Sequence, residues 1–232
     1  LFADEGARVA VVDVQSERVA AVVAEIHGAH GPDAARGWVC DVGNHAAIHR
    51  LGEEVPAHFG GVDILVNNAG ISRPNSVFQE EDSYEANWER TLAVNLTAHS
   101  RLVRVFLPAL MRSGAGRVVN IASTEALVAA PGLTAYGAAK AGVVGLTRSL
   151  AVELGKHGVN VNCIYPGPID TAMTAPIPEQ DKATYARRRV PLRRYGDPEE
   201  VAQMTLNLCL PASSFVTGAA IAVDGGMSIR HT

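Results

Sequence analysis

The chain alternates short apolar runs with longer stretches in which apolar positions recur at helical spacing. Buried strands are predicted for the β-branched runs bounded by turn residues, at residues 8–13, 38–40, 63–66, 117–122, 160–165 and 218–224. Amphipathic helices are predicted at residues 16–27 and 86–111. This alternation indicates one α/β domain.

Capping residues and prolines predict several helix boundaries. Ser16 can serve as the N-cap of the first long helix, and Asn44 opens the next one. Pro56 lies inside that second helix and should kink it. A later helix opens at Asp197 and Pro198, where proline near the first turn is tolerated.

The chain has 232 residues, of which 47% are hydrophobic, and a formal charge of -4 at pH 7. One domain of this length can bury a large core. The mild negative charge argues against a nucleic-acid surface, and the single basic run, residues 187–189, is typical of a solvated face. No membrane span or signal peptide is visible, so a soluble cytoplasmic protein is expected.

The cysteines and histidines do not indicate a metal site. Cys40, Cys163 and Cys209 are scattered, and the first two lie in predicted strands, where a buried thiol fills the core. His45 and His49 are four residues apart on a predicted helix, but no third ligand follows at a zinc-like spacing. We therefore predict no metal.

Tyr136 and Lys140 form a candidate acid/base pair, because residues four apart on a helix lie one turn apart on one face. A tyrosine has a pKa of about 10, and lowering it to about 7 needs about 4 kcal/mol. One ammonium about 4 Å away supplies roughly that energy at an effective dielectric constant of about 20. The spacing alone also fits a half-exposed surface pair, so the choice between the two interpretations depends on the rest of the chain.

Four further motifs accompany this pair in order: Asn67-Asn68-Ala69-Gly70 after one strand, Asn95 within a helix, Ser123 after another strand, and residues 166–171 after a third. The set resembles the short-chain dehydrogenase/reductase family over nearly the whole chain. The resemblance implies a Rossmann-like, doubly wound parallel sheet. It implies Tyr136 as the acid/base and Lys140 as the group that lowers its pKa, with Ser123 orienting the substrate oxygen. The matching Asn95 would sit at a helix break and hold a relay water, although it could also be the N-cap of a restarted helix.

Asp13, at the tip of its strand, indicates the cofactor. A carboxylate there can accept hydrogen bonds from both adenosine ribose hydroxyls and would repel a 2′-phosphate, so NAD is favoured over NADP. Asp13 could instead cap the helix near Ser16. By resemblance, Asp41 and Val42 would lie beside the adenine, although Asp41 could equally be a helix N-terminal carboxylate. The remaining cofactor contacts implied are Asn68, Ala69, Gly70, Tyr136, Lys140, Pro166, Gly167, Ile169 and Thr171.

The start of the sequence departs from the family pattern. Residues 1–7 read as the last turns of a helix that ends at Gly6, and no G-x-G-x-x-G turn precedes them. The family carries a Thr-Gly-x-x-x-Gly-x-Gly turn there, and a βαβ unit of roughly 30 residues implies on the order of 20 missing residues. We expect the natural protein to have that first strand and glycine-rich turn, and an intact mass of 24.4 kDa would contradict this.

Two segments are expected to shape substrate binding and assembly. Residues 172–195 are polar, contain prolines and are predicted to form a lid over the substrate. The helix of Tyr136 is rich in alanine and glycine, which favours close approach of the sheet or a partner helix, and a homo-oligomer, a tetramer or dimer, is expected.

The function predicted is NAD-dependent interconversion of a small-molecule secondary alcohol and a ketone, as in a short-chain alcohol dehydrogenase or ketoreductase. One alternative is an NADP-dependent 3-oxoacyl-(acyl carrier protein) reductase. Another is a non-catalytic dinucleotide-sensing or scaffold protein, which the intact Ser-Tyr-Lys set disfavours. The substrate is not indicated, because residues 124–133 suggest only an apolar wall.

Overall fold

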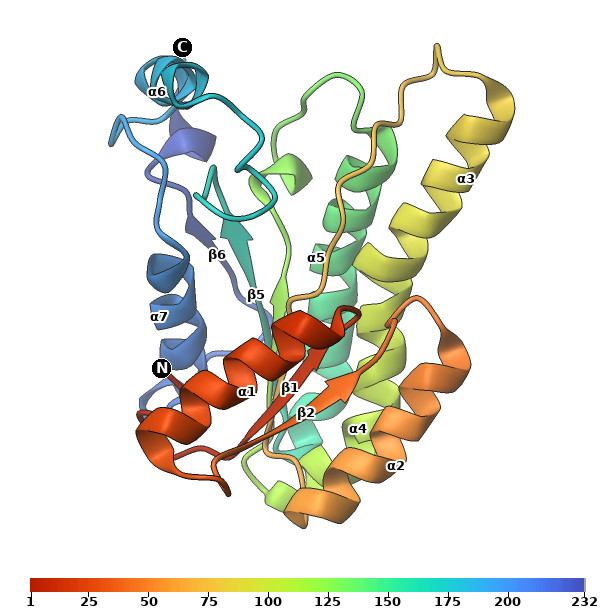
Figure 1. Cartoon of the computed structure of the whole chain (residues 1–232), viewed down its shortest axis with the longest axis vertical. Coiled ribbons are helices and arrows are strands. Elements are labelled where there is room, and N and C mark those ends of the chain that lie inside the picture. The colour runs from red at the N-terminus through yellow and green to blue at the C-terminus, as the bar shows by residue number, and fades with distance from the viewer. Residues whose placement is uncertain (232) are drawn as a thin grey trace.

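The computed structural model describes residues 1–231, which form one α/β domain (Figure 1). In chain order its elements are β1 (Val9–Asp13), α1 (Ser16–His30), β2 (Ala35–Val39), α2 (His45–Phe59), β3 (Ile64–Asn67), α3 (Glu81–Leu92), η1 (Ala93–Thr97), α4 (Ala98–Ser113), β4 (Arg117–Ile121), η2 (Thr124–Ala126), α5 (Thr134–Leu154), η3 (Gly155–His157), β5 (Asn160–Pro166), α6 (Glu179–Arg189), α7 (Pro198–Cys209), η4 (Pro211–Ser213), β6 (Ala220–Val223) and η5 (Met227–Ile229).

Every strand ladder is parallel, as predicted. The strands form two groups, the pair β1-β2 and the four-stranded sheet β3-β4-β5-β6. Within the part of the chain that the structure describes, no ladder joins β1 to β3. Parallel strands carry their carboxyl ends on a common edge, so the loops that follow β3, β4 and β5 emerge together.

Helices cover both faces of the sheet, because successive residues of a strand point to opposite sides. Val118 of β4 packs into a core cluster with α2 and α4, whereas its neighbour Val119 packs into a second cluster with α7. On β5, Cys163 packs with α5 residues and Ile164 with the α7 cluster. In Figure 1, α7 and α5 accordingly lie on either side of β4 and β5. The predicted doubly wound arrangement is confirmed.

The long helix expected at residues 86–111 is interrupted. It runs as α3, then five residues of π-helix (η1), then α4, and extends from Glu81 to Ser113. Asn95 lies in the middle of the π-helical segment, so the interpretation of Asn95 as the N-cap of a restarted helix is wrong. A π-bulge inside a helix often marks a functional site.

Two local predictions need correction. Ser16 is the first residue of α1 rather than its N-cap, which is Gln15 and makes no side-chain capping bond. Helix α2 contains Pro56, as expected, and runs on to Phe59 before Gly60 in the left-handed region, and the kink at Pro56 stays a prediction. Cys40 follows the last residue of β2 instead of belonging to the strand.

Other predicted boundaries are confirmed. Asn44 caps α2 by accepting a hydrogen bond from the Ala47 N–H, and Asp197 opens α7 through a capping box with Glu200. The helical turns predicted for residues 1–7 are not a helix in the structure, because residues 2–6 form turns, although Gly6 does have a left-handed φ of +82°.

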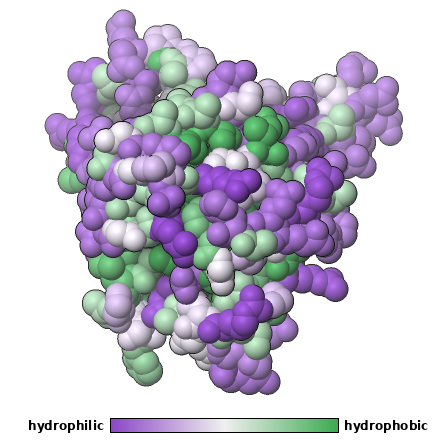
Figure 2. Space-filling view, turned by 60° about the horizontal axis from the view of Figure 1, so that its bottom comes forward, coloured by the Kyte–Doolittle hydropathy of each residue, from purple (hydrophilic) through white to green (hydrophobic). Residues whose placement is uncertain are grey.

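Hydrophilic residues cover most of the face shown in Figure 2, and hydrophobic ones appear as small separate groups between them. Among residues 1–231, no helix has the length and apolar character needed to cross a membrane. The same residues contain no cluster of three or more His, Cys, Asp or Glu side chains with the geometry of a metal site.

Candidate active site

The loops at the carboxyl ends of β3 and β4 meet the N-terminal part of α5 and the π-helix η1. Lys140 Nζ lies 5.7 Å from the centroid of the Tyr136 ring. A Cβ atom placed on Gly70 would lie 3.6 Å from Asn95 Oδ1 and 3.7 Å from Lys140 Nζ, so these groups share one site. The structure therefore brings Asn95, Tyr136 and Lys140 together from separate elements, and Ser123 joins them through Tyr136.

The N-terminus of α5, which carries Tyr136, is fixed by a residue that the sequence analysis missed. Asn75 is fully buried in the loop after β3, and its Oδ1 accepts a hydrogen bond of 3.2 Å from the Ala135 N–H. Thr134 Oγ1 donates to the Asn75 backbone oxygen at 2.7 Å, and Asn75 Nδ2 donates to the Tyr84 carbonyl. Asn75 thus connects α3 to α5 and holds Tyr136 in place.

Ser123 follows β4 and acts as the N-cap of η2. Its Oγ accepts a hydrogen bond of 3.2 Å from the Glu125 N–H, and the residue is 9% exposed. The Ser123 hydroxyl lies near enough to the Tyr136 side chain to lower the pKa of that phenol. This pairing agrees with the proposed role of Ser123 beside the acid/base.

The pKa of Tyr136 differs from the sequence-based expectation. Burial raises it above its usual value, and Ser123 opposes that effect, while the carboxylate of Glu125 raises the pKa further. Lys140 is not among the groups that shift the pKa of Tyr136 here. The lowering of this pKa by Lys140 stays a prediction.

Lys140 is directed toward the end of β4. Its Nζ donates a hydrogen bond of 2.7 Å to the Ile121 carbonyl oxygen, and the residue is 3% exposed. Burial lowers the pKa of Lys140 to about 8, because the charged form is poorly solvated there. An ammonium has three donors, so two remain after the bond to Ile121.

Asn95 fastens the π-helix to the loop after β3. Its Oδ1 accepts from the Ile71 N–H at 2.9 Å, and its Nδ2 donates to the Ile71 carbonyl at 2.8 Å. Asn95 is completely buried. These two bonds position Gly70, one residue earlier, against Lys140.

A buried polar cluster lies behind Lys140, between the sheet and α4 and α5. Asn67 Nδ2 donates to Asn120 Oδ1 at 2.8 Å, and Asn120 Nδ2 donates to Thr147 Oγ1 at 2.9 Å. His99 of α4 is 2% exposed, and neither ring nitrogen has a partner among the described residues. We call Asn67, His99, Asn120, Lys140 and Thr147 the buried polar cluster. The sequence analysis did not single out His99.

His99 makes stability depend on pH. Burial lowers its pKa to about 3, with a smaller contribution from Lys140. Since an unfolded histidine titrates near 6.5, the neutral ring stabilises the fold above that pH, and this contribution is lost as pH falls toward 3. Between pH 7 and 5 we expect the wild type to lose about 2 kcal/mol more unfolding free energy than His99→Leu. Urea unfolding of both proteins at the two pH values measures this, and parallel losses would contradict it.

The residues predicted to meet the adenosine differ in their surroundings. Asp13 Oδ1 accepts a hydrogen bond of 2.8 Å from the Gln15 N–H, and Oδ2 makes none to the described residues. Asp41 Oδ1 accepts from the Gly43 N–H and pairs with Arg90 at 2.9 Å, and that guanidinium holds the Asp41 pKa below its usual value. The Val42 side chain packs in the core, which leaves its backbone for any ligand contact.

The other candidate cofactor residues line the loops after β3 and β5. Asn68 and Ala69 are exposed, and Gly70 is half-buried. Pro166 ends β5, and at Gly167 an added Cβ would come within 2.7 Å of the Asp224 backbone, so this glycine permits close approach of β6. The Ile169 N–H and the Thr171 hydroxyl donate no hydrogen bond to residues 1–231, so both are available.

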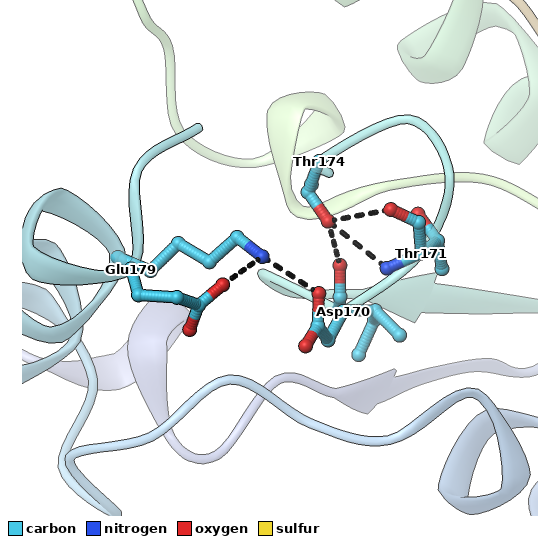
Figure 3. A network of polar contacts seen from close by, with 6 residues as sticks. Asp170, Thr171, Thr174 and Glu179 are labelled. Atoms are coloured by element: carbon cyan, nitrogen blue, oxygen red, sulfur yellow. Dashed lines mark hydrogen bonds and ion pairs between the residues drawn. The ribbon is translucent and has the colours of Figure 1, made fainter. Parts of the chain in front are cut away.

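An ion-pair network joins the loop after β5 to α6 (Figure 3). Lys182 Nζ lies 2.8 Å from Asp170 Oδ1 and 2.7 Å from Glu179 Oε1. Lys182 is the buried member, with a side chain only 7% exposed, whereas the Glu179 side chain is 82% exposed. In the same loop Thr174 Oγ1 donates to the carbonyl oxygens of Ile169 and Thr171. The sequence analysis missed this network, because its partners come from a loop and a helix whose contact no spacing rule predicts.

We predict that Lys182→Met frees α6 from the loop that contains Ile169 and Thr171. The methionine keeps the apolar stem but removes both ion pairs, so limited proteolysis within residues 172–189 should become a few-fold faster. Glu179→Gln is the matched control, because its carboxylate is largely solvated and one ion pair remains. Equal proteolysis rates in all three proteins would show that Lys182 does not restrain α6.

The comparisons with known proteins agree with this geometry. Residues 1–228 match the family model described as "Enoyl-(Acyl carrier protein) reductase". The chain is 38% identical to the 3-oxoacyl-[acyl-carrier-protein] reductase FabG of Thermotoga maritima, over 99% of this chain and 91% of that protein. It is 34% identical to the D-threitol dehydrogenase of Mycolicibacterium smegmatis, over 99% and 86%. The crystal structure of a "putative short-chain alcohol dehydrogenase" from Sinorhizobium meliloti 1021 superposes with a TM-score of 0.89 at 31% identity, over 97% of this chain and 88% of that one.

Proposed function

The chain belongs to the short-chain dehydrogenase/reductase family of oxidoreductases, and from this premise we propose that it interconverts a secondary alcohol and a ketone with NAD. The observation that carries the proposal is the convergence of Ser123, Tyr136 and Lys140: Ser123 lowers the pKa of the Tyr136 phenol, and Lys140 Nζ lies 5.7 Å from the centroid of its ring. Substrate and cofactor preference are part of this proposal.

The residues present fit a nicotinamide dinucleotide. Lys140 has donors left beyond its bond to Ile121, and the Ile169 N–H and Thr171 hydroxyl are available at the same sheet edge. Asp13 offers an oxygen that makes no hydrogen bond within residues 1–231. Lys140 would hold the nicotinamide ribose, Ile169 and Thr171 the carboxamide and a phosphate, and Asp13 the adenosine ribose. When bound, NAD supplies the hydride acceptor.

The chain's own residues would handle the proton and the substrate oxygen. Ser123 orients the alcohol oxygen next to Tyr136 and stabilises charge that develops on it. Tyr136 removes the hydroxyl proton as general base, or returns it in the reverse direction. The ammonium of Lys140 stabilises the phenolate once other charges in the site are in place. Asn95 supports this proton transfer by fixing the loop around Gly70, next to Lys140.

A second candidate function is the reduction of 3-oxoacyl groups on an acyl carrier protein with NADP. The names of relatives such as the Thermotoga maritima reductase favour it. Asp13 argues against it, because its carboxylate would repel a 2′-phosphate. The relative named D-threitol dehydrogenase favours a polyol or other small alcohol instead.

We also propose that the protein is a cytoplasmic homo-oligomer, a dimer or tetramer, built partly on α5. Gly142 faces inward, where an added Cβ would meet the Leu96 side chain at 2.8 Å. A Cβ added to Gly145 would meet no other part of the protein within 4 Å, and Val152 on the same helix is 85% exposed. An outward face of small residues suits a partner helix. Light scattering on the purified protein tests this.

Fluorescence titration with NADH and NADPH, followed by turnover with secondary alcohols, tests the proposed function. Tight NADH binding with weak NADPH binding, together with alcohol-dependent NADH formation, would support it. Preferred turnover of a 3-oxoacyl thioester with NADPH would favour the second candidate. Binding without turnover of any alcohol or ketone would favour a dinucleotide-sensing protein. If the protein is an enzyme of either kind, we expect residues 172–195 to fold over its substrate.

A further inference from the structure

His99 is the one member of the buried polar cluster whose polar atoms are all without a protein partner. It is 2% exposed, and both ring nitrogens lack a hydrogen bond to the described residues. Asn67 Oδ1, in the same cluster, also has none. An unsatisfied buried polar group costs about 1 to 3 kcal/mol compared with an apolar group of the same shape. The other buried residues of α4 are apolar, so this histidine requires an explanation beyond packing.

The position of His99 relates it to the candidate active site. It lies four residues after Asn95, in the first turn of α4, which continues directly from η1. Lys140, from α5, reaches the carbonyl of Ile121, the residue next to Asn120 on β4. Besides burial, two groups shift the pKa of His99, namely Lys140 of α5 and Asn120 of β4. His99 and Lys140 therefore approach the same point of β4 from neighbouring helices.

The hydrogen-bonding capacities of these groups are complementary. Lys140 has two donors left after its bond to Ile121. A neutral imidazole has one acceptor and one donor nitrogen, and Asn67 Oδ1 is an acceptor. The low pKa of His99 keeps the ring neutral at the pH at which the protein works. The ring can thus accept one hydrogen bond and donate another, which matches the free donors of Lys140 and the free acceptor of Asn67.

We propose that His99 is a positioning residue for Lys140: its neutral ring supplies, across one bridging water, the acceptor that holds Lys140 as an ammonium ion beside Tyr136. This inference rests on the proposed function, because it concerns the same acid/base. His99 does not touch the substrate. It acts by favouring the charged form of Lys140, which in turn favours the phenolate of Tyr136. Besides Lys140, the charged group at this end of the site is Glu125 of η2, whose carboxylate raises the pKa of Tyr136.

The test measures the ionisation of Tyr136 itself with NAD bound. Tyrosinate absorbance is recorded against pH for each protein, and the curve of the same protein carrying Tyr136→Phe is subtracted. Loss of a hydrogen bond to a charged group should raise the Tyr136 midpoint in His99→Leu by about one pH unit. His99→Gln keeps an acceptor and a donor and should return the midpoint toward the wild-type value. The acidic limb of the pH profile of alcohol oxidation, where the rate rises as Tyr136 loses its proton, should shift by the same amount.

Val103→Ala is the matched control, since Val103 is buried one turn further along the same face of α4 and has no polar group. It should lower stability and leave the Tyr136 midpoint unchanged. Equal midpoints in wild type and His99→Leu, or the same shift in Val103→Ala, would overturn the proposal. If His99→Leu does not fold, His99→Met serves as the apolar variant. The absorbance titration needs no substrate, so it decides the role of His99 even if the protein oxidises no alcohol.

Discussion

Tyr136→Phe is expected to lower kcat for alcohol oxidation by about 10²- to 10⁴-fold, which is the usual contribution of a positioned general base. The substitution removes one oxygen and keeps the ring that packs beside Lys140 Nζ. Fold and NADH affinity should therefore stay close to those of the wild type. The residual rate should no longer depend on pH in the range where the phenol titrates. Steady-state kinetics across pH, with circular dichroism and an NADH titration on the same sample, measure these quantities.

Tyr84→Phe is the matched control for this loss. Tyr84 lies on α3, stacks on Trp88 and makes no hydrogen bond through its hydroxyl to the described residues. Removing that hydroxyl should leave kcat within about twofold of the wild type, as for most substitutions away from a functional contact. If Tyr136→Phe keeps more than a tenth of the wild-type kcat, Tyr136 is not the general base, and the acid/base must be another group.

The parts of the fold that depend on local pattern could be predicted from the sequence. The β-branched runs became β1, β3, β4, β5 and β6 with boundaries shifted by a few residues at most, because short buried strands carry a strong apolar signal. The caps at Asn44 and Asp197 also follow from local chemistry. The prediction of Ser16 as the N-cap was wrong by one residue, because the presence of a residue type that often caps helices does not fix where a helix begins.

The features that depend on tertiary contacts could not be predicted. The π-helix at Asn95 is stabilised by two hydrogen bonds to Ile71, a residue that is 24 positions away in the chain. Asn75 caps α5 from a distance of 60 residues. Sequence spacing gives no access to such partners, although a polar residue within an otherwise apolar helix face, such as His99, is a usable signal.

The electrostatics of the site show why composition and spacing do not determine a pKa. Tyr136 and Lys140 do lie together, yet burial raises the pKa of the phenol and lowers that of the ammonium. Each of these shifts disfavours the ion pair that the spacing suggested. In the protein by itself, desolvation therefore outweighs the attraction. The ionised pair needs further stabilisation, from the cofactor and, in our inference, from His99.

Asp13→Ala is expected to reverse the cofactor preference. The carboxylate would repel the 2′-phosphate of NADP, and two unit charges about 4 Å apart repel by about 4 kcal/mol at an effective dielectric constant of about 20. Asp13 is half-exposed, so solvent weakens this repulsion, and we expect NADPH affinity to rise about tenfold. NADH affinity should fall about tenfold or more, because hydrogen bonds to a charged group contribute about 1.5 to 3 kcal/mol.

Asp13→Asn separates the two effects, because the amide keeps the size of the side chain and one acceptor oxygen but carries no charge. It should gain as much NADPH affinity as Asp13→Ala and lose less NADH affinity. Fluorescence titrations of the three proteins with both cofactors measure how much each variant changes the affinity for NADH and for NADPH relative to the wild type. If neither variant changes the NADH-to-NADPH affinity ratio, Asp13 does not select the cofactor. In that case its carboxylate only closes the turn at Gln15, and the argument against a reductase that uses NADP no longer holds.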